Sequence, residues 1–308
     1  MPRRHHSVVT DAETGERLDT FVSRASGVSR NRVQSMIECG HVTVDGGPAK
    51  KNHLLCFGET VEWKVPDPEP ENMRPQDMPL EVLFEDEDII VIDKPAGMVM
   101  YPGPGHSEST LANALLARHP SMAGVGGKGR PGVFHRLDRD TSGLVAVALS
   151  QRAYDAMVEE LKDRRMERVY NALVVGDIAA EVGTIDAPMG RASHDRKKMA
   201  VTPSGGLRAV SHFKVLDRFD REYTLVEVTL ETGRTHQIRV HFAYIGHPVV
   251  GDPDYSRGKS AKRLELGRQF LHAVRLIFDH PVSGERMSFS SPLPQDLSDV
   301  LATLRRKR

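Results

Sequence analysis

The spacing of hydrophobic residues near the start of the chain predicts a small domain of two short helices followed by strands. Apolar residues recur at helical spacing between residues 18 and 25 and again between residues 33 and 37. Ser29 can cap the start of the second helix, and Gly40 can end it. The alternating segment at residues 61–65 then predicts a half-buried strand.

From residue 80 onward, longer apolar segments predict a larger domain that mixes strands and helices. Strands are expected near residues 89–92, 144–149, 168–176, 223–230, 271–278 and 287–289, and helices at residues 110–116, at residues 151–163 and from residue 295. Residues 67–79 are rich in Pro and acidic residues and have little to bury, as is typical of a linker. The pattern therefore predicts domains at residues 1–66 and 80–308, joined by this linker.

Composition adds that the charges are unevenly distributed along the chain. The 308 residues include 42 Lys and Arg against 42 Asp and Glu, for a formal net charge of zero. Between Asp67 and Asp88, however, Arg74 is the only basic residue among many acidic ones, so the remainder of the chain has a basic excess. A local basic face is what nucleic-acid binding requires.

The cysteines and the apolar runs argue against several other classes of protein. Cys39 and Cys56 are the only cysteines and lack Cys-x-x-Cys spacing, so they indicate neither a disulfide framework nor a thiolate metal site. No apolar run approaches the roughly 20 residues of a membrane span, and residues 1–6 lack the apolar stretch of a signal peptide. We therefore expect a cytoplasmic protein without a membrane segment.

The segment from Phe134 to Leu144 combines charged residues with a turn, and it leads into the apolar run at residues 144–149. This order predicts a reactive turn at the mouth of a buried strand. Asp138 lies close to Arg136 and Arg139, and nearby positive charge favours its ionised form. The alternative interpretation is a polar loop with incidental ion pairs, because structural ion pairs also perturb carboxylates.

A second polar turn, at residues 232–241, follows the strand predicted at residues 223–230. Thr235 can cap the helix that begins there. Arg239 would leave the buried face of that helix toward the site, so we expect it to pair with Asp138, with Arg234 as the alternative. His236 and His241 are five residues apart, unlike the helical His pair of a zinc hydrolase, and we assign no metal.

Residues 135–144, His-Arg-Leu-Asp-Arg-Asp-Thr-Ser-Gly-Leu, resemble the signature of the RluA/RluD family of RNA pseudouridine synthases. Residues 93–97, residues 232–241 and the Tyr-x-Ala-Leu-Val-x-Gly pattern that begins at Tyr170 resemble the same family. The resemblance implies an α+β fold in which an active cleft crosses the middle of a mixed, mostly antiparallel sheet. It also implies that Asp138 is the catalytic residue and that Tyr170 packs against the target base.

The resemblance extends to the start of the chain. Residues 17–19, 29–30 and 40–46 are similar to the small RNA-binding domain named after ribosomal protein S four, so residues 1–66 are expected to form a small α/β RNA-binding module. Arg30 and Arg32 fall in the first turn of its second helix, where backbone amides add to their attraction for phosphate.

The activity implied is conversion of specific uridines to pseudouridine in RNA, with 23S RNA of the large ribosomal subunit as the expected substrate. The enzyme must flip the nucleotide out, cleave its glycosidic bond, rotate the base and rejoin it through carbon. No redox change or added group is involved, so no cofactor and no metal are expected. A monomer is the simplest expectation.

Site residues follow from the same resemblance and from the charge pattern. Asp138, Tyr170 and Arg239 are the expected catalytic residues. Related sequences commonly have His at the position of Tyr101, so that residue is assigned no chemistry. The expected substrate contacts are basic and polar residues of both motifs, of the basic segment at residues 191–198 and of the N-terminal module: His135, Arg136, Arg139, Arg234, His236, Gln237, Lys198, Arg30 and Arg32.

Two other classes of function stay open at this level. A non-catalytic RNA-binding or ribosome-assembly protein would need the basic surface but no buried carboxylate facing phosphate. A nucleoside or glycoside hydrolase usually places two carboxylates on either side of the bond it cleaves, and Asp140 could supply the second one. For Asp138 itself, covalent attack on the ribose and removal of a ribose proton are equally open.

Overall fold

The computed structural model describes residues 4–28, 30–65, 73–103, 106–127, 129–192, 195, 198–256, 264 and 266–306. The chain divides into two compact units, Met1–Asn72 and Met73–Arg308. The second unit therefore begins before residue 80, inside the predicted linker. Asn113 of the second unit donates a hydrogen bond to the backbone oxygen of Arg74 and accepts at its own carbonyl from the amide of Gln76, so residues 73–79 are held by that unit.

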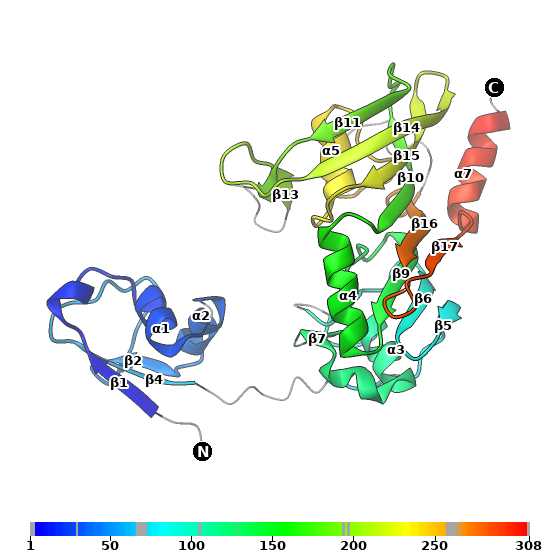
Figure 1. Cartoon of the computed structure of the whole chain (residues 1–308). Coiled ribbons are helices and arrows are strands. Elements are labelled where there is room, and N and C mark those ends of the chain that lie inside the picture. The colour runs from blue at the N-terminus through cyan, green and yellow to red at the C-terminus, as the bar shows by residue number, and fades with distance from the viewer. Residues whose placement is uncertain are drawn as a thin grey trace. The chain divides into compact units, whose positions relative to one another are not determined.

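The first unit pairs two helices with a small sheet (Figure 1). Its helices are α1, Leu18–Ser26, and α2, Arg30–Glu38, preceded by the short 3-10 helix η1, Asp11–Glu13. Its strands are β1, Arg4–Val8, β2, Val42–Val44, β3, Gly47–Pro48, and β4, Thr60–Lys64, in the sheet order β1-β4-β2-β3. The predicted order of two helices and then strands is confirmed, whereas β1 was not predicted. Ser29, the expected helix cap, lies outside the described residues.

The second unit is built on a nine-stranded sheet in the order β11-β14-β15-β10-β16-β9-β6-β5, with β17 paired to β16 (Figure 1). Its strands are β5, Glu81–Glu85, β6, Ile89–Lys94, β9, Ser142–Ala148, β10, Glu167–Val175, β11, Val182–Asp186, β14, Val210–Phe219, β15, Tyr223–Leu230, β16, Leu271–Asp279, and β17, Arg286–Ser290. Within the described part of this sheet, β9 and β16 are the one parallel pair. The predicted mixed, mostly antiparallel sheet is confirmed.

Helices and two small ribbons complete the second unit. The helices are α3, Leu111–Arg118, η2, Pro120–Gly124, α4, Gln151–Lys162, α5, Gln237–Tyr244, and α7, Gln295–Arg306. The ribbons pair β7, Gly126–Gly127, with β8, Arg130–Pro131, and β12, Met189–Arg191, with β13, Met199–Val201. Within the described residues, no helix combines the length and apolar character needed to cross a membrane.

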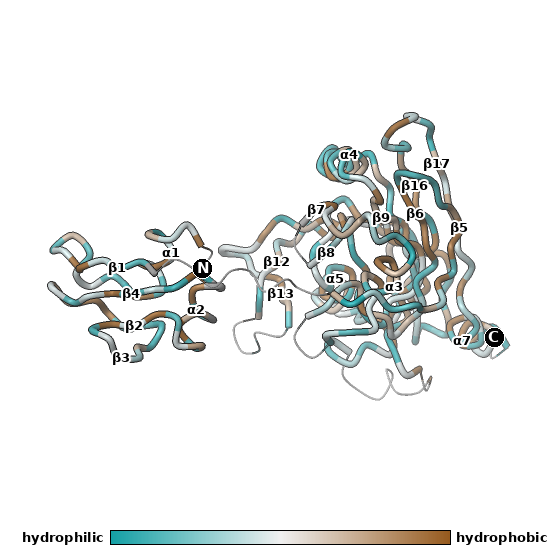
Figure 2. The backbone as a smooth tube through the Cα atoms, turned by 90° about the horizontal axis from the view of Figure 1, so that it is seen from below, coloured by the Kyte–Doolittle hydropathy of each residue, from teal (hydrophilic) through white to brown (hydrophobic). Residues whose placement is uncertain are grey.

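The middle of the sheet is the most apolar part of the second unit. Every residue of β9 is buried, which explains why its sequence is a continuous run of small and apolar residues. Figure 2 shows hydrophobic positions gathered along β6, β9 and β16. Gly143 allows β9 and β16 to approach closely, because a Cβ there would lie 2.3 Å from the backbone oxygen of Ala273 and its φ is +108°. The loop that precedes β9 is thus brought to the centre of the sheet.

Helix α5 begins one residue later than the sequence predicted. His236, with φ 58°, is the residue at its N-terminal boundary, so the prediction that Thr235 caps the helix is wrong. The side chain of Gln237 instead accepts hydrogen bonds from the Thr232 hydroxyl and the Arg234 amide. These bonds hold the turn before α5 and direct Arg239 into the site.

Candidate active site

The loop that carries Asp138 is a tight turn held by buried groups. The amide of Thr141 donates to the backbone oxygen of Asp138 at 3.1 Å. The carbonyl of Arg139 accepts from the Lys94 ammonium at 3.1 Å and from the Gly97 amide at 2.9 Å. Lys94 is fully buried, and burial lowers its pKa to about 7, against the opposing effect of Asp138. The turn after β6 therefore supports the Asp138 loop directly.

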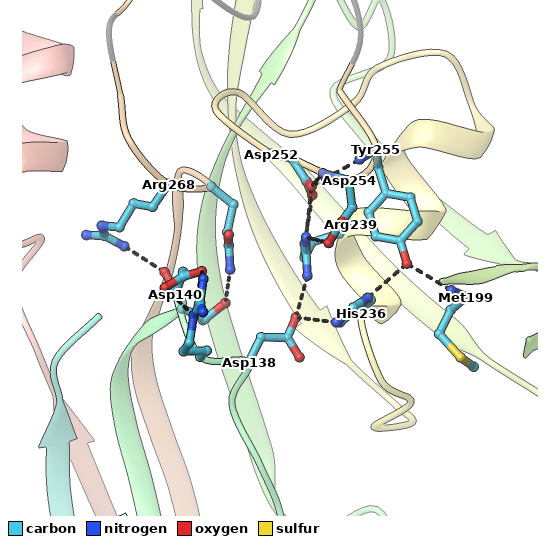
Figure 3. Close-up of polar contacts among 12 residues, drawn as sticks. Asp138, Asp140, Met199, His236, Arg239, Asp252, Asp254, Tyr255 and Arg268 are labelled. Atoms are coloured by element: carbon cyan, nitrogen blue, oxygen red, sulfur yellow. Dashed lines mark hydrogen bonds and ion pairs between the residues drawn. The ribbon is translucent and has the colours of Figure 1, made fainter. Parts of the chain in front are cut away.

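Asp138 faces a guanidinium group from α5. Its Oδ2 lies 3.3 Å from Arg239 Nη1 and 3.9 Å from His236 Nε2, and 14% of its side chain is exposed (Figure 3). Asp140 points away from Asp138 and pairs with Arg139 at 2.9 Å. The structure thus places Arg239, and not Arg234, beside Asp138. It also separates the two carboxylates that a hydrolase would need on either side of one bond.

Arg239 is itself held by two further carboxylates. Asp252 accepts two hydrogen bonds from it, at 2.7 Å and 2.8 Å, and Asp254 accepts one at 2.7 Å. The guanidinium also lies over the Tyr255 ring, 5.1 Å from its centroid. Burial opposes the charged form, but these bonds outweigh it and raise the pKa of Arg239. Arg239 is therefore a fixed cation, aimed at Asp138 by partners that sequence analysis did not assign.

His236 and Lys198 brace the same network. His236 Nδ1 is 2.8 Å from the Tyr255 hydroxyl, which accepts a hydrogen bond from the Met199 amide (Figure 3). Burial lowers the pKa of His236, and the charge of Asp138 partly opposes this. Lys198 donates to the backbone oxygen of Asp254 at 2.8 Å, so its ammonium supports the loop that holds Arg239.

A cavity of about 510 Å³ opens next to Asp138. Tyr170, on β10, forms part of its wall together with Asp138, and a smaller adjoining pocket reaches Arg239 and His236. Tyr170 is 5% exposed, and burial raises its pKa, so the phenol stays protonated at neutral pH. Among the described residues that line the cavity, the carboxylates are Asp138 and Glu231. The basic side chains outnumber them and make the cavity cationic: Arg130, Arg136, Lys162, Arg164, Arg168, Arg208 and Arg234.

Tyr101 lies in this cavity although sequence analysis assigned it no chemistry. Its hydroxyl accepts a hydrogen bond from Arg136 Nη1 at 2.9 Å. The guanidinium groups of Arg130 and Arg136 lie 4.5 Å and 5.5 Å from its ring centroid. Two exposed arginines are thereby fixed at the rim by cation–π contacts, which is a positioning role for Tyr101 that its divergence from related sequences did not indicate.

Three residues that were expected to contact the substrate make their main polar contacts with other residues of the protein. Gln237 is 3% exposed, and its amide nitrogen donates to the Val210 carbonyl and the Ser211 hydroxyl while its oxygen is also occupied. His135 is 7% exposed and accepts from the Ala146 amide, and Arg139 is paired with Asp140. The hydrogen-bonding groups of the Gln237 side chain are therefore used within the fold.

In the first unit, a buried carboxylate organises the two helices. Asp19 is fully buried and accepts hydrogen bonds from Arg17, Arg30 and Gln34. Burial alone would raise its pKa, but these donors lower it. Arg30 is thus an ion-pair partner with a half-exposed side chain, still accessible to phosphate. The side chain of Arg32 lies outside the described residues.

The site combines a carboxylate held by a buried arginine with a tyrosine and a cationic cavity, and an enzyme that binds the phosphates of a nucleic acid requires such a combination. Known proteins identify it further. The profile described as RNA pseudouridylate synthase matches residues 88–244, and the S4 domain profile matches residues 16–61. The chain belongs to the RNA pseudouridylate synthase family and is an RNA pseudouridine synthase with an N-terminal S4 domain.

Related proteins are similar in sequence along nearly the whole chain. An uncharacterized RNA pseudouridine synthase YlyB of Bacillus subtilis is 44% identical over 298 residues, 96% of this chain and 97% of that protein. Ribosomal large subunit pseudouridine synthase D of Xanthomonas campestris is 44% identical over 313 residues, covering 97% and 92%. The solved structure of human RNA Pseudouridylate Synthase Domain Containing 1 matches with a TM-score of 0.56 and 27% identity, covering 74% of this chain and 95% of that one. The implied family and fold are confirmed.

Proposed function

We propose that this enzyme converts specific uridines of large-subunit ribosomal RNA to pseudouridine. The relatives named ribosomal large subunit pseudouridine synthase D, at 40–44% identity, support this choice of substrate. The cationic cavity supports an RNA substrate independently of those names. In this proposal the enzyme works as a cytoplasmic monomer, with its S4 domain at the start of the chain contributing RNA contacts that include Arg30 and Arg32.

Asp138 is the group that we propose to act on the ribose of the flipped nucleotide. The single observation that carries this role is its ion pair with Arg239 at the wall of the cavity that Tyr170 also lines. Arg239 orients the carboxylate, as a nucleophile at the anomeric carbon or a base beside it requires. Tyr170 packs against the uracil, and its protonated hydroxyl can assist proton movement at the carbon that is rejoined.

The phosphate anchors come from the rim of the same cavity. Arg136, Arg234 and Arg130 are exposed there and, among the described residues, form no ion pair with a carboxylate. They can therefore contact the RNA backbone and offset the few kcal/mol lost when a nucleotide leaves its stack. Tyr101 fixes Arg136 in advance, which reduces the entropy lost on binding.

The test is a single-turnover assay on large-subunit ribosomal RNA with tritium at uridine C5. Wild-type enzyme should release tritium and form pseudouridine at discrete positions, whereas Asp138→Asn should bind RNA normally and lose at least about 10²- to 10⁴-fold in rate. Asp140→Asn is the matched control, because Asp140 points away from the cavity, and it should retain most of the activity.

Two outcomes would contradict this assignment. If wild type binds RNA but forms no pseudouridine on free RNA or on ribosomal particles, the substrate assignment fails. If free uracil accumulates in place of pseudouridine, the enzyme is a hydrolase on that substrate. Equal activity of wild type and Asp138→Asn would remove Asp138 from the mechanism.

A further inference from the structure

Arg168 is a buried cation that lacks a carboxylate partner. It lies on β10 and is 8% exposed, yet no carboxylate among the described residues forms an ion pair with it. Its Nε has no hydrogen-bond partner, and its Nη2 reaches the Leu230 carbonyl only at 3.4 Å. Burying an unpaired charge is costly, and burial lowers the pKa of Arg168. A guanidinium in this position is explained if a ligand completes its environment.

His135 presents a second buried donor in the same wall. Its Nε2 accepts from the Ala146 amide at 3.0 Å, so in the neutral ring the proton is on Nδ1. Burial lowers the pKa of His135 to about 3, with the charge of Arg168 adding to the effect, so the ring is neutral at physiological pH. Nδ1 has no hydrogen-bond partner among the described residues. Both residues line the same cavity, but Nδ1 is itself buried, so the neutral His135 ring leaves Arg168 as the charged group of this wall.

The strand places Arg168 on the same side as the residue expected to contact the base. Arg168 and Tyr170 are two apart on β10, so their side chains share one face of the sheet, and both line the cavity with Asp138. Gly233 leaves room for the guanidinium, because a Cβ there would lie 2.6 Å from Arg168 Nη1. The rim residues Arg130, Arg136 and Arg234 are exposed, whereas Arg168 is buried in the wall that also holds Tyr170.

We propose that the guanidinium of Arg168 hydrogen-bonds a carbonyl oxygen of the flipped uracil and stabilises the anion formed when its glycosidic bond breaks. The inference rests on the proposed function. Whichever route Asp138 takes, the bond between the anomeric carbon and N1 breaks and its electron pair leaves with the base. The negative charge spreads onto the carbonyl oxygens. C5 then bonds to the sugar and gives up its proton while N1 gains one, so the net change is an isomerisation.

A donor that serves this charge acts mainly in the transition state. Preorganised donors aimed at developing charge in a water-excluded site typically contribute about 10²- to 10³-fold in rate. Because the uracil of bound RNA is neutral before the bond breaks, removing Arg168 should affect the rate far more than RNA affinity. A phosphate contact would show the reverse, since the phosphate carries its charge in the bound and unbound states alike.

The experiment compares wild type, Arg168→Met and Arg168→Lys on RNA containing either uridine or 5-fluorouridine at the target. Fluorine stabilises the departing base anion and so reduces the need for a stabilising donor. We expect Arg168→Met to lose about 10²- to 10³-fold in single-turnover rate on uridine RNA, with RNA affinity within about threefold of wild type. The loss on 5-fluorouridine RNA, followed as disappearance of 5-fluorouridine, should be at least about tenfold smaller. Arg168→Lys should recover part of the rate.

Controls separate this inference from folding and from the proposed function. Arg275→Met removes another arginine of the same sheet, one that pairs with Glu227 outside the cavity, and should leave both rates unchanged. If Arg168→Met does not fold, Gly233→Ala displaces the guanidinium without deleting it and should reproduce the difference between the two substrates. An equal loss on both substrates, or a loss in affinity alone, overturns the inference. Inactivity of wild type on uridine RNA would instead overturn the proposed function.

Discussion

Replacing Asp252 by Asn removes one of the two carboxylate oxygens that accept hydrogen bonds from Arg239. Asp252 is 2% exposed and Arg239 is 3% exposed, and the two share a bidentate pair. Asn can keep the contact to Arg239 Nη2 through its remaining oxygen. Its amide nitrogen then faces the Nε–H of Arg239, so a donor meets a donor and one charge-assisted hydrogen bond is lost.

The size of the effect follows from these contacts. One hydrogen bond to a charged group contributes about 1.5–3 kcal/mol, and the donor facing Nε adds to that loss, so we expect Asp252→Asn to destabilise the second unit by about 3 kcal/mol. At roughly 2–4 °C per kcal/mol for a domain of this size, its Tm should fall by about 6–12 °C. Misorientation of Arg239 beside Asp138 should also slow single-turnover pseudouridine formation by about tenfold or more.

The assay can assign the change to one unit because Trp63, in the first unit, is the only tryptophan of the chain. Far-UV circular dichroism should show a lower second-unit transition, while the transition followed by tryptophan fluorescence stays in place. Asp254→Asn is the matched control: Asp254 is 37% exposed and makes a single bond to Arg239, so it should cost less than about 1 kcal/mol. Equal Tm shifts for the two variants would refute the reasoning from burial.

Three further predictions concern stability. Because the folded-state pKa of His135, about 3, lies below its ordinary value of 6.5, the unfolded chain binds more protons between these values, and the second unit should lose stability as the pH falls through that range. His135→Gln should flatten this dependence in urea titrations, and an unchanged slope would contradict the burial argument. Asp19→Asn should destabilise the first unit by about 2–4 kcal/mol at neutral pH. The loss should be smaller in acid, because the Asp19 carboxylate, whose pKa is lowered in the folded state, stabilises the unit only while it is ionised. A loss of stability that is independent of pH, measured by tryptophan fluorescence, would count against this. Gly143→Ala should cost more than about 3 kcal/mol, since its Cβ would overlap Ala273 backbone, and a soluble variant with wild-type Tm would show that β9 and β16 can separate.

Much of the fold could be predicted because the hydrophobic pattern within each segment indicates its secondary structure. The strands β6, β9, β10 and β15 and helix α4 match the expected segments to within two residues at either end. Their hydrophobic periodicity reflects burial on one or both faces, which each segment shows by itself. The edge strands β11 and β1 were missed because they are short and partly exposed, so their patterns are weak.

The candidate site was only partly predictable, and there is a physical reason why some of its residues could be predicted and others could not. Asp138, Tyr170 and Arg239 lie in motifs whose residue order is visible in one dimension. Asp252, Arg168 and Tyr101 matter through contacts with residues distant along the chain. The bidentate pair of Asp252 spans 13 residues, and the cation–π pair of Tyr101 with Arg136 spans 35. The role of Asp252 depends on the direction of the Arg239 side chain, which the tertiary structure shows.

By itself, the sequence determined the class of fold, the family and the identity of the central carboxylate, because periodicity and contiguous motifs need no partner to be read. Only the tertiary structure decided which charges are paired. It showed that the side-chain amide of Gln237 is hydrogen-bonded inside the fold and that Asp140 turns away from Asp138. It also showed that Arg168 is buried without a carboxylate partner in the described part of the chain. The physical reason is that a charge acquires its pKa, its orientation and its availability from its neighbours in space, and the order of residues along a chain does not specify those neighbours.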